Sequence, residues 1–168
     1  MKKELDKELY PDYVYPEFTP DPGKPFREPI AKLGKKITDR IPQKLGLKKI
    51  TRNDPEYWGL AGVLTDEEAL LALKLGVRKP KTLSEIVKIS GLEEKKCEAL
   101  LEEMSRKGLL EYNWENAAHE KQYVLPMYVP GCAEFFNMNA KILESNPEMG
   151  TFLSLIHISE PTRQAEIS

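Results

Sequence analysis

The sequence is poor in the residues that most often carry chemistry. Its 168 residues include two cysteines and two histidines, and two isolated cysteines cannot supply the four ligands of an iron–sulfur cluster or a structural zinc site. It has no Gly-rich phosphate loop, catalytic serine motif or metal-binding helix motif. It lacks an apolar run of ~20 residues that could cross a bilayer, and its N-terminus lacks the apolar segment of a signal peptide. We expect a cytoplasmic protein without membrane contact, whose chain carries no catalytic, cofactor-binding or metal-binding residues.

An excess of charge of one sign is also missing. The net charge of −2 creates no overall field that favours nucleic acid or an anionic membrane. Hydrophobic residues make up 40% of the chain, which is enough for one core, and the length fits one domain with extensions. The low cysteine count fits a reducing compartment.

Three residues remain as candidates for reactivity. Cys97 falls on the apolar stripe of a predicted helix, so we expect it to behave as a small buried hydrophobe. Cys132 follows Gly131 near a predicted helix start, where a thiolate could be stabilised, but no base is close to it in the sequence. His119 lies alone in a predicted loop. A small enzyme that uses Cys132 is therefore a minor hypothesis beside the two that are developed below.

The first 29 residues do not fit a helix or a central strand. Residues 1–29 contain six prolines, which exclude both elements, but also more aromatic residues than a disordered tail usually has. We interpret them as an extended Pro-rich N-terminal arm. Three placements stay open, namely packing on its own domain, packing on a partner domain, and disorder.

A basic helical segment, residues 30–64, comes next. Residues 24–52 contain ten Lys or Arg and two acidic residues, a net charge of +8. This favours a solvated face or an acidic protein partner over a phosphate backbone. Asp54 and Pro55 predict the start of a second helix. Apolar residues have helical spacing up to Pro42: Ile30, Leu33, Ile37 and Ile41.

Residues 65–125 predict a winged helix-turn-helix domain, so the expected fold class is α+β and mostly helical. Two S/T-x-x-E patterns, at residues 65–68 and 82–85, are typical of capping boxes. The first precedes a short Leu-rich helix that ends at Gly76, with Leu70, Leu71, Leu73 and Leu75 buried. The second opens a helix over 81–90 with an apolar face: Leu83, Ile86, Val87 and Ile89.

The second half of this domain supplies the expected recognition helix and wing. Gly91 allows the sharp turn into a helix over 92–107, and Gly108 suits its C-terminal end. The apolar stripe of this helix is Leu92, Cys97, Leu100, Leu101 and Met104. Two strand-like runs, 109–114 and 122–126, alternate apolar and polar residues and predict a β-hairpin.

The remaining chain divides in two. Residues 126–152 predict a truncated helical continuation, with one helix over 131–143 and another that starts at Asn146. Residues 153–168 differ in origin, because LSLIHISEPTR, from Leu153 to Arg163, resembles the translation of a transposase sequencing adapter. We expect the natural coding sequence to be interrupted at Phe152 and the tail to be an artefact, so His157 carries no functional meaning.

DNA binding is a common function of winged helices, but the charges disfavour it. The expected recognition helix carries five acidic and four basic residues, and the wing loop adds Glu115 and Glu120 against Lys121. Each phosphate contact needs a cation, so we expect nucleic acid not to bind. A free-standing winged-helix DNA-binding transcriptional regulator is the alternative hypothesis.

Three stretches carry a resemblance to a known family: residues 8–67, which begin ELYPDYVYPEF, residues 100–116, and residues 119–135, HEKQYVLPMYVPGCAEF. They are similar to the N-terminal region of multidomain 4Fe-4S, FAD-dependent pyridine-nucleotide oxidoreductases of anaerobic bacteria, whose later part resembles the glutamate synthase small subunit. The resemblance implies that cluster cysteines and dinucleotide glycines lie beyond Phe152, so no functional residue can be assigned here.

The resemblance also sets the expected function. It implies that 4Fe-4S clusters, FAD and NAD(P) belong to downstream redox domains, which would be the partners of this chain. We expect a non-catalytic docking or scaffold fragment of an iron–sulfur flavin oxidoreductase that takes part in electron transfer. The electron donor, the acceptor and the oligomeric state stay open.

Overall fold

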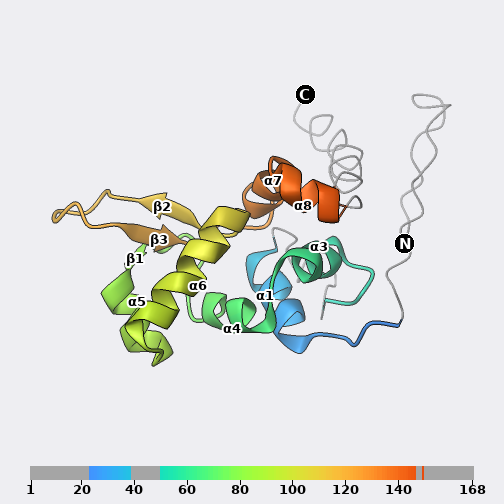
Figure 1. The fold of residues 1–168 in the computed structure, drawn as a ribbon, viewed down its shortest axis with the longest axis horizontal. Coiled ribbons are helices and arrows are strands. Elements are labelled where there is room, and N and C mark those ends of the chain that lie inside the picture. The colour runs from blue at the N-terminus through green and yellow to red at the C-terminus, as the bar shows by residue number, and fades with distance from the viewer. Residues whose placement is uncertain (1–22, 39–49, 147–148, 150–168) are drawn as a thin grey trace, which may run out of the picture.

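The computed structural model describes residues 23–38, 50–146 and 149, and Figure 1 shows their arrangement. The fold is α+β and mostly helical, as the sequence predicts. Most of the predicted arm, the end of the basic stretch around Ile41 and the tail 153–168 lie outside the described residues. The elements are α1 (Glu28–Ile37), α3 (Pro55–Val63), α4 (Asp66–Ala72), β1 (Lys81–Thr82), α5 (Leu83–Ser90), α6 (Glu94–Lys107), β2 (Glu111–Asn113), β3 (Gln122–Val124), α7 (Cys132–Asn137) and α8 (Ala140–Ser145).

The three strands form one antiparallel sheet in the order β1-β3-β2. Tyr123 in the central strand lies opposite Tyr112 of β2 and Lys81 of β1. The hairpin predicted from residues 109–125 is confirmed, and it extends away from the helices in Figure 1. The short strand β1 corrects the prediction of a helix from residue 81. The backbone of Thr82 is extended because this residue caps α5, so the helix begins at Leu83.

Local capping explains the other helix ends of this region. Both predicted capping boxes are present: the Thr65 Oγ1 accepts from the Glu68 amide, and the Thr82 Oγ1 accepts from the Glu85 amide. Glu93 caps α6 by accepting from two backbone amides, so α6 begins two residues later than predicted. Gly91 and Gly108 have φ of 73° and 94°. These left-handed conformations are strained for residues with a Cβ, which is why glycine ends both helices.

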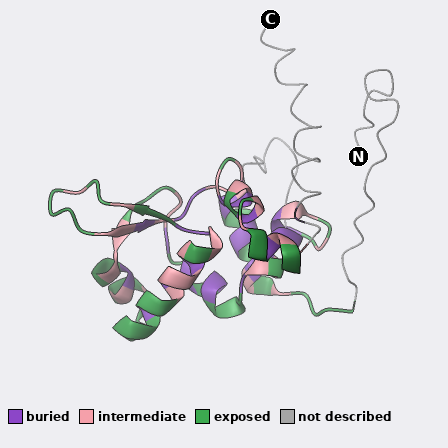
Figure 2. Cartoon of the chain, turned by 45° about the horizontal axis from the view of Figure 1, so that its top comes forward, coloured by how far each residue is buried: buried purple, intermediate pink, exposed green. Residues whose placement is uncertain are grey.

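One hydrophobic core connects all the helices, and Figure 2 shows the buried residues on their inner faces. The predicted stripe of α1 is confirmed, because Ile30, Leu33 and Ile37 are fully buried where α1 packs on α3 and α4. Each such side chain contributes roughly 1.5–3 kcal/mol by leaving water. The stripe of α6 faces the same core through Cys97, Leu101 and Met104.

Four local predictions are wrong. Leu70 and Ile89, expected in the core, are 54% and 41% exposed, because each lies on the outer side of a short helix. The Leu-rich helix ends at Ala72, before Gly76, and residues 73–75 form turns. Pro29, assigned to the extended arm, lies in the first turn of α1, where proline lacks only an amide that the helix would not use.

The single helix predicted over 131–143 is two helices. α7 ends at Asn137, and Asn139 caps α8 by accepting a hydrogen bond of 3.4 Å from the Ile142 amide. An asparagine that caps a new helix interrupts the old one, because its side chain replaces a backbone partner. The break leaves Met138 between the two helices and 80% exposed.

Candidate interaction surfaces

The outer face of α6 is where a winged helix would read DNA. Lys96 pairs with Glu67 of α4, Arg106 pairs with Glu103, and Lys107 pairs with Glu68. Three of the four cations of the helix are thus held by carboxylates. Among the described residues, Lys95 is the one cation of α6 without an ion pair, and the exposed Glu94 and Glu98 lie beside it. This surface offers little positive charge to a phosphate backbone.

A polar cluster fixes the hairpin to the middle of α6. The carboxylate of Glu102 accepts hydrogen bonds of 2.6 Å from the Lys121 ammonium, 2.6 Å from the Tyr123 hydroxyl and 2.8 Å from the Tyr112 hydroxyl. The Lys121 Nζ also lies 3.8 Å from the centre of the Tyr112 ring, a cation–π contact. These bonds, the one from Lys121 first, lower the pKa of Glu102 to about 2. Sequence reasoning missed this cluster because its members come from α6, β2, β3 and the loop before β3.

The basic stretch 24–52 uses part of its charge inside the fold. The Arg27 guanidinium donates to the carbonyls of Ala61 and Leu64 and forms an ion pair with Asp66. It thereby satisfies carbonyls at the C-terminal end of α3, where a helix has no internal donors left. Lys36 donates to the carbonyl of Leu73 at 2.7 Å. These two cations bind the protein itself and are not available to a partner.

The three residues singled out for reactivity lie on different elements: Cys97 in α6, Cys132 at the start of α7, and His119 between β2 and β3. Cys97 and Cys132 are both fully buried and free. Burial, and next the Glu134 carboxylate, raise the pKa of Cys132 well above its ordinary value, which contradicts a stabilised thiolate. His119 lies exposed in the hairpin loop with φ of 51°. The structure therefore brings none of the three together.

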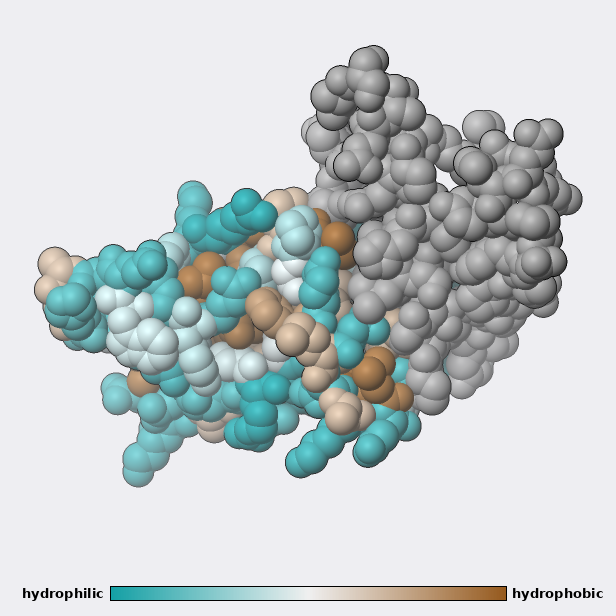
Figure 3. Space-filling model, turned by 90° about the horizontal axis from the view of Figure 1, so that it is seen from above, coloured by the Kyte–Doolittle hydropathy of each residue, from teal (hydrophilic) through white to brown (hydrophobic). Residues whose placement is uncertain are grey.

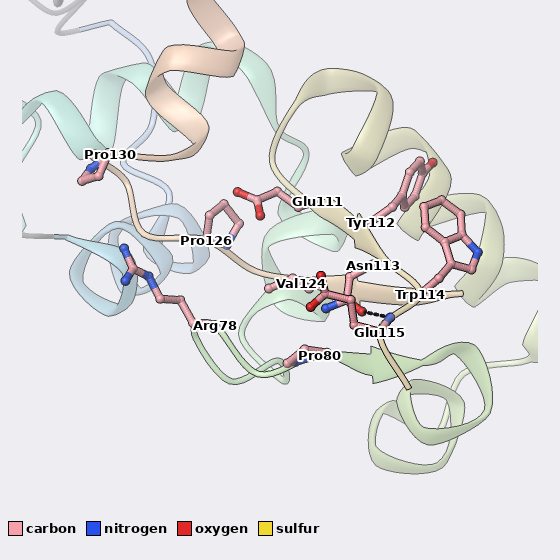
Figure 4. Close-up of a pocket in the computed structure, with 10 residues that line it drawn as sticks. All are labelled: Arg78, Pro80, Glu111, Tyr112, Asn113, Trp114, Glu115, Val124, Pro126 and Pro130. Atoms are coloured by element: carbon pink, nitrogen blue, oxygen red, sulfur yellow. Dashed lines mark hydrogen bonds between the residues drawn. The ribbon is translucent and has the colours of Figure 1, made fainter. Parts of the chain in front are cut away.

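One hollow of about 760 Å³ lies on the side of the sheet away from α6. Figure 4 shows Glu111, Asn113 and Arg78 lining it, whereas the rings of Tyr112 and Trp114 point to the other side of β2. The Asn113 Oδ1 accepts a hydrogen bond from the Glu115 backbone amide, so the side chain of Asn113 stabilises a local turn. None of the described residues that line this hollow is a histidine, cysteine or serine.

A larger groove of about 1110 Å³ runs between α6, the start of β2 and the pair α7–α8. Figure 3 looks at the molecule from the side of α7 and α8, and apolar residues gather there among charged ones. Tyr112, Phe135 and Met138 line the groove and are 40%, 41% and 80% exposed. Large apolar side chains exposed together often mark an interaction site. Sequence reasoning missed the groove, because its lining residues come from five elements that are spread along the sequence.

Neither metal coordination nor a membrane span is supported within the described part of the chain. No group of three or more His, Cys, Asp or Glu side chains there could hold a metal ion. None of the described helices is both long and apolar enough to cross a bilayer. Comparison with protein-family models, with curated proteins and with solved structures finds no match to this chain.

Proposed function

We propose that residues 65–125 form a winged-helix domain and that the chain is a non-catalytic docking module of an iron–sulfur flavin oxidoreductase. Support for the domain comes from the element order. A helix, a short strand, two packed helices and a hairpin follow one another from α4 to β3, and the short strand pairs with the far strand of the hairpin. This arrangement places α6 and the hairpin loop on the surface, as a winged helix does.

The observation that carries the docking role is the charge state of α6. A DNA reader needs free cations on this helix, whereas three of its four cations are paired with carboxylates. A protein partner tolerates such a mixed surface, because interfaces use apolar anchors and complementary charges. The resemblance of the sequence to oxidoreductase N-termini supplies the partner class, namely domains that carry 4Fe-4S clusters, FAD and NAD(P).

The residues described here do not fit the cofactors themselves. A 4Fe-4S cluster needs four thiolates, and the chain has two cysteines, both buried on separate helices. We therefore assign no step of electron transfer to this chain. Its role would be to hold redox domains in position.

Binding to the redox region tests the proposal directly. The full chain is mixed with the cluster- and flavin-carrying region of an oxidoreductase of the resembling family, and binding is measured by calorimetry. Because a tether within one protein supplies effective concentrations near ~1 mM, a dissociation constant on the order of 100 µM suffices for docking. Absence of binding when the redox region is present at about 1 mM would refute the docking role.

The alternative, a DNA-binding regulator, is favoured by the element order alone and has its own test. Anisotropy of labelled duplex DNA is measured with the full chain at about 50 mM and about 200 mM salt. We expect no binding at either salt concentration. The double variant Glu94→Lys with Glu98→Lys is the positive control, since it changes the charge of the exposed end of α6 by +4. Strong, salt-dependent binding by the unmodified chain would favour the regulator.

A further inference from the structure

The groove between α6 and α7–α8 exposes large apolar side chains from separate elements. Phe135 and Met138 come from the two sides of the break after α7, and Tyr112 comes from β2. Its volume of about 1110 Å³ exceeds the ~300–1,000 Å³ that is typical of small-molecule pockets. It therefore fits a stretch of polypeptide better than a compact ligand.

Residues 8–21 of the same chain have the matching chemistry. This stretch, ELYPDYVYPEFTPD, contains four acidic residues, four aromatic residues and no Lys, Arg or His. The charged residues of the groove are Arg106, Lys107 and Lys141 against Glu103 and Glu111. Arg106 is paired with Glu103 and Lys107 with Glu68, so Lys141 is, among the described lining residues, the cation left to face an acidic segment. The match therefore rests mainly on the aromatic side chains of the segment and the exposed apolar side chains of the groove. The prolines of the segment restrict the unbound chain, which reduces the entropy lost on docking.

The chain leaves the described domain close to one wall of the groove. Phe26 stacks on Tyr57 of α3 with ring centres 4.7 Å apart, and Arg27 binds the carbonyl of Ala61. The next two residues of α3, Gly62 and Val63, line the groove. At ~3.3 Å per extended residue, Phe18 can lie ~17 Å from Gly23 and Tyr10 ~43 Å from it. The segment is therefore tethered beside the groove and long enough to follow it.

We infer that residues 8–21 dock in cis in the groove between α6 and α7–α8, with their aromatic side chains against Phe135 and Met138. This assigns a place to the N-terminal arm, and it stands independently of the docking role proposed above. The cis tether makes weak contacts sufficient, because the arm is always present at high effective concentration.

Chymotrypsin digestion of the full chain tests this inference. Tyr13 and Phe18 precede Val14 and Thr19 and can be cleaved, whereas Tyr10 and Tyr15 precede proline and cannot. When docking is fast, the cleavage rate reports the fraction of undocked arm. Met138→Asp should accelerate cleavage after Tyr13 and Phe18 on the order of tenfold, because it places a carboxylate in the groove next to an acidic segment. Lys141→Glu should accelerate it on the order of twofold.

Two matched variants control for general effects. Ile89→Asp removes an apolar side chain of α5 that is 41% exposed, and Lys88→Glu reverses an exposed charge on the same helix. Neither residue lines the groove, so neither variant should change the cleavage rate. Urea unfolding checks that all four variants stay folded, which the 80% exposure of Met138 favours.

Three outcomes would overturn the inference. Equal cleavage rates in Met138→Asp and Ile89→Asp would mean that the groove does not hold the arm. Protection that depends on protein concentration would place the arm on a second copy. Protection that appears only after the redox region is added would place it on a partner domain, an outcome that is compatible with the docking role and separates the two proposals.

Discussion

Lys107, at the end of α6, donates hydrogen bonds of 2.7 and 2.8 Å to the two carboxylate oxygens of Glu68, in the first turn of α4. The side chains of Glu68 and Lys107 are 3% and 20% exposed. The same carboxylate accepts from the Thr65 amide at 2.7 Å and completes the capping box. One buried carboxylate thus joins the start of α4 to the end of α6.

We expect Lys107→Met to destabilise the protein by about 3 kcal/mol, because it leaves a buried carboxylate without its cation. Adding Glu68→Gln should restore much of this loss, since glutamine keeps the capping box and removes the charge. Urea unfolding of the two single variants and the double variant measures the coupling. A double variant that is no more stable than Lys107→Met would show that the charge of Glu68 is not what makes the single variant unstable.

The Glu102 cluster predicts a specific acid sensitivity. The pKa of the Glu102 carboxyl is lowered from 4.5 to about 2 in the folded protein. A depressed carboxyl pKa gives stability that is complete above the unfolded value and is lost as the pH falls from about 4.5 towards about 2. We expect Glu102→Gln to be less stable than the unmodified chain at pH 6, and the gap to narrow as the pH falls below about 4.5 and to close only near about 2. Glu103→Gln, which breaks an exposed ion pair with Arg106, should cost less at pH 6. A constant gap across this pH range would contradict the assignment.

Substitutions of Gly91 and Gly108, which end α5 and α6, can distinguish the cost of backbone strain from the cost of steric conflict. A Cβ at Gly91 would meet nothing within 4 Å, whereas a Cβ at Gly108 would lie 2.7 Å from the Cβ of Phe135. Both positions have positive φ. We expect Gly91→Ala to cost about 1 kcal/mol from strain alone, and Gly108→Ala to cost clearly more. Gly91→Asn should cost less than Gly91→Ala, because asparagine tolerates this conformation. Thermal or urea unfolding of the three variants decides the order.

These examples indicate which parts of the fold the sequence could predict. The capping boxes at Thr65 and Thr82 and the turn at Gly91 are signals contained in four residues or fewer, so they could be read without knowledge of the fold. The hairpin follows from alternation over a short run. The core stripes of α1 and α6 follow from helical spacing.

The rest depends on contacts between distant parts of the chain. Lys107 and Glu68 are 39 residues apart, and the Glu102 cluster joins α6 to both strands of the hairpin. Leu70 and Ile89 are apolar enough for a core but lie on the outer side of a short helix, where they are 54% and 41% exposed. Asn139, which lines the groove, starts a new helix. Helical periodicity does not reveal this choice between capping and continuation.

Thiol chemistry gives the last prediction. Cys97 and Cys132 are fully buried, and burial raises the pKa of each thiol above its ordinary value. Because the thiolate is the reactive species and must be reached by the reagent, modification requires the protein to open. We expect a disulfide reagent such as DTNB to modify neither cysteine on the timescale of a free thiol, and to modify both once guanidinium has unfolded the chain.

The same thiol-modification experiment tests the hypothesis of a small enzyme that uses Cys132. A catalytic cysteine must react in the folded state, so rapid modification of Cys132 in the folded chain would contradict the buried geometry and return it as a candidate nucleophile. Cys132→Ser and Cys97→Ser assign any reaction to one of the two positions. If both thiols react only at the rate at which the chain opens, their contribution is to packing around α6 and α7.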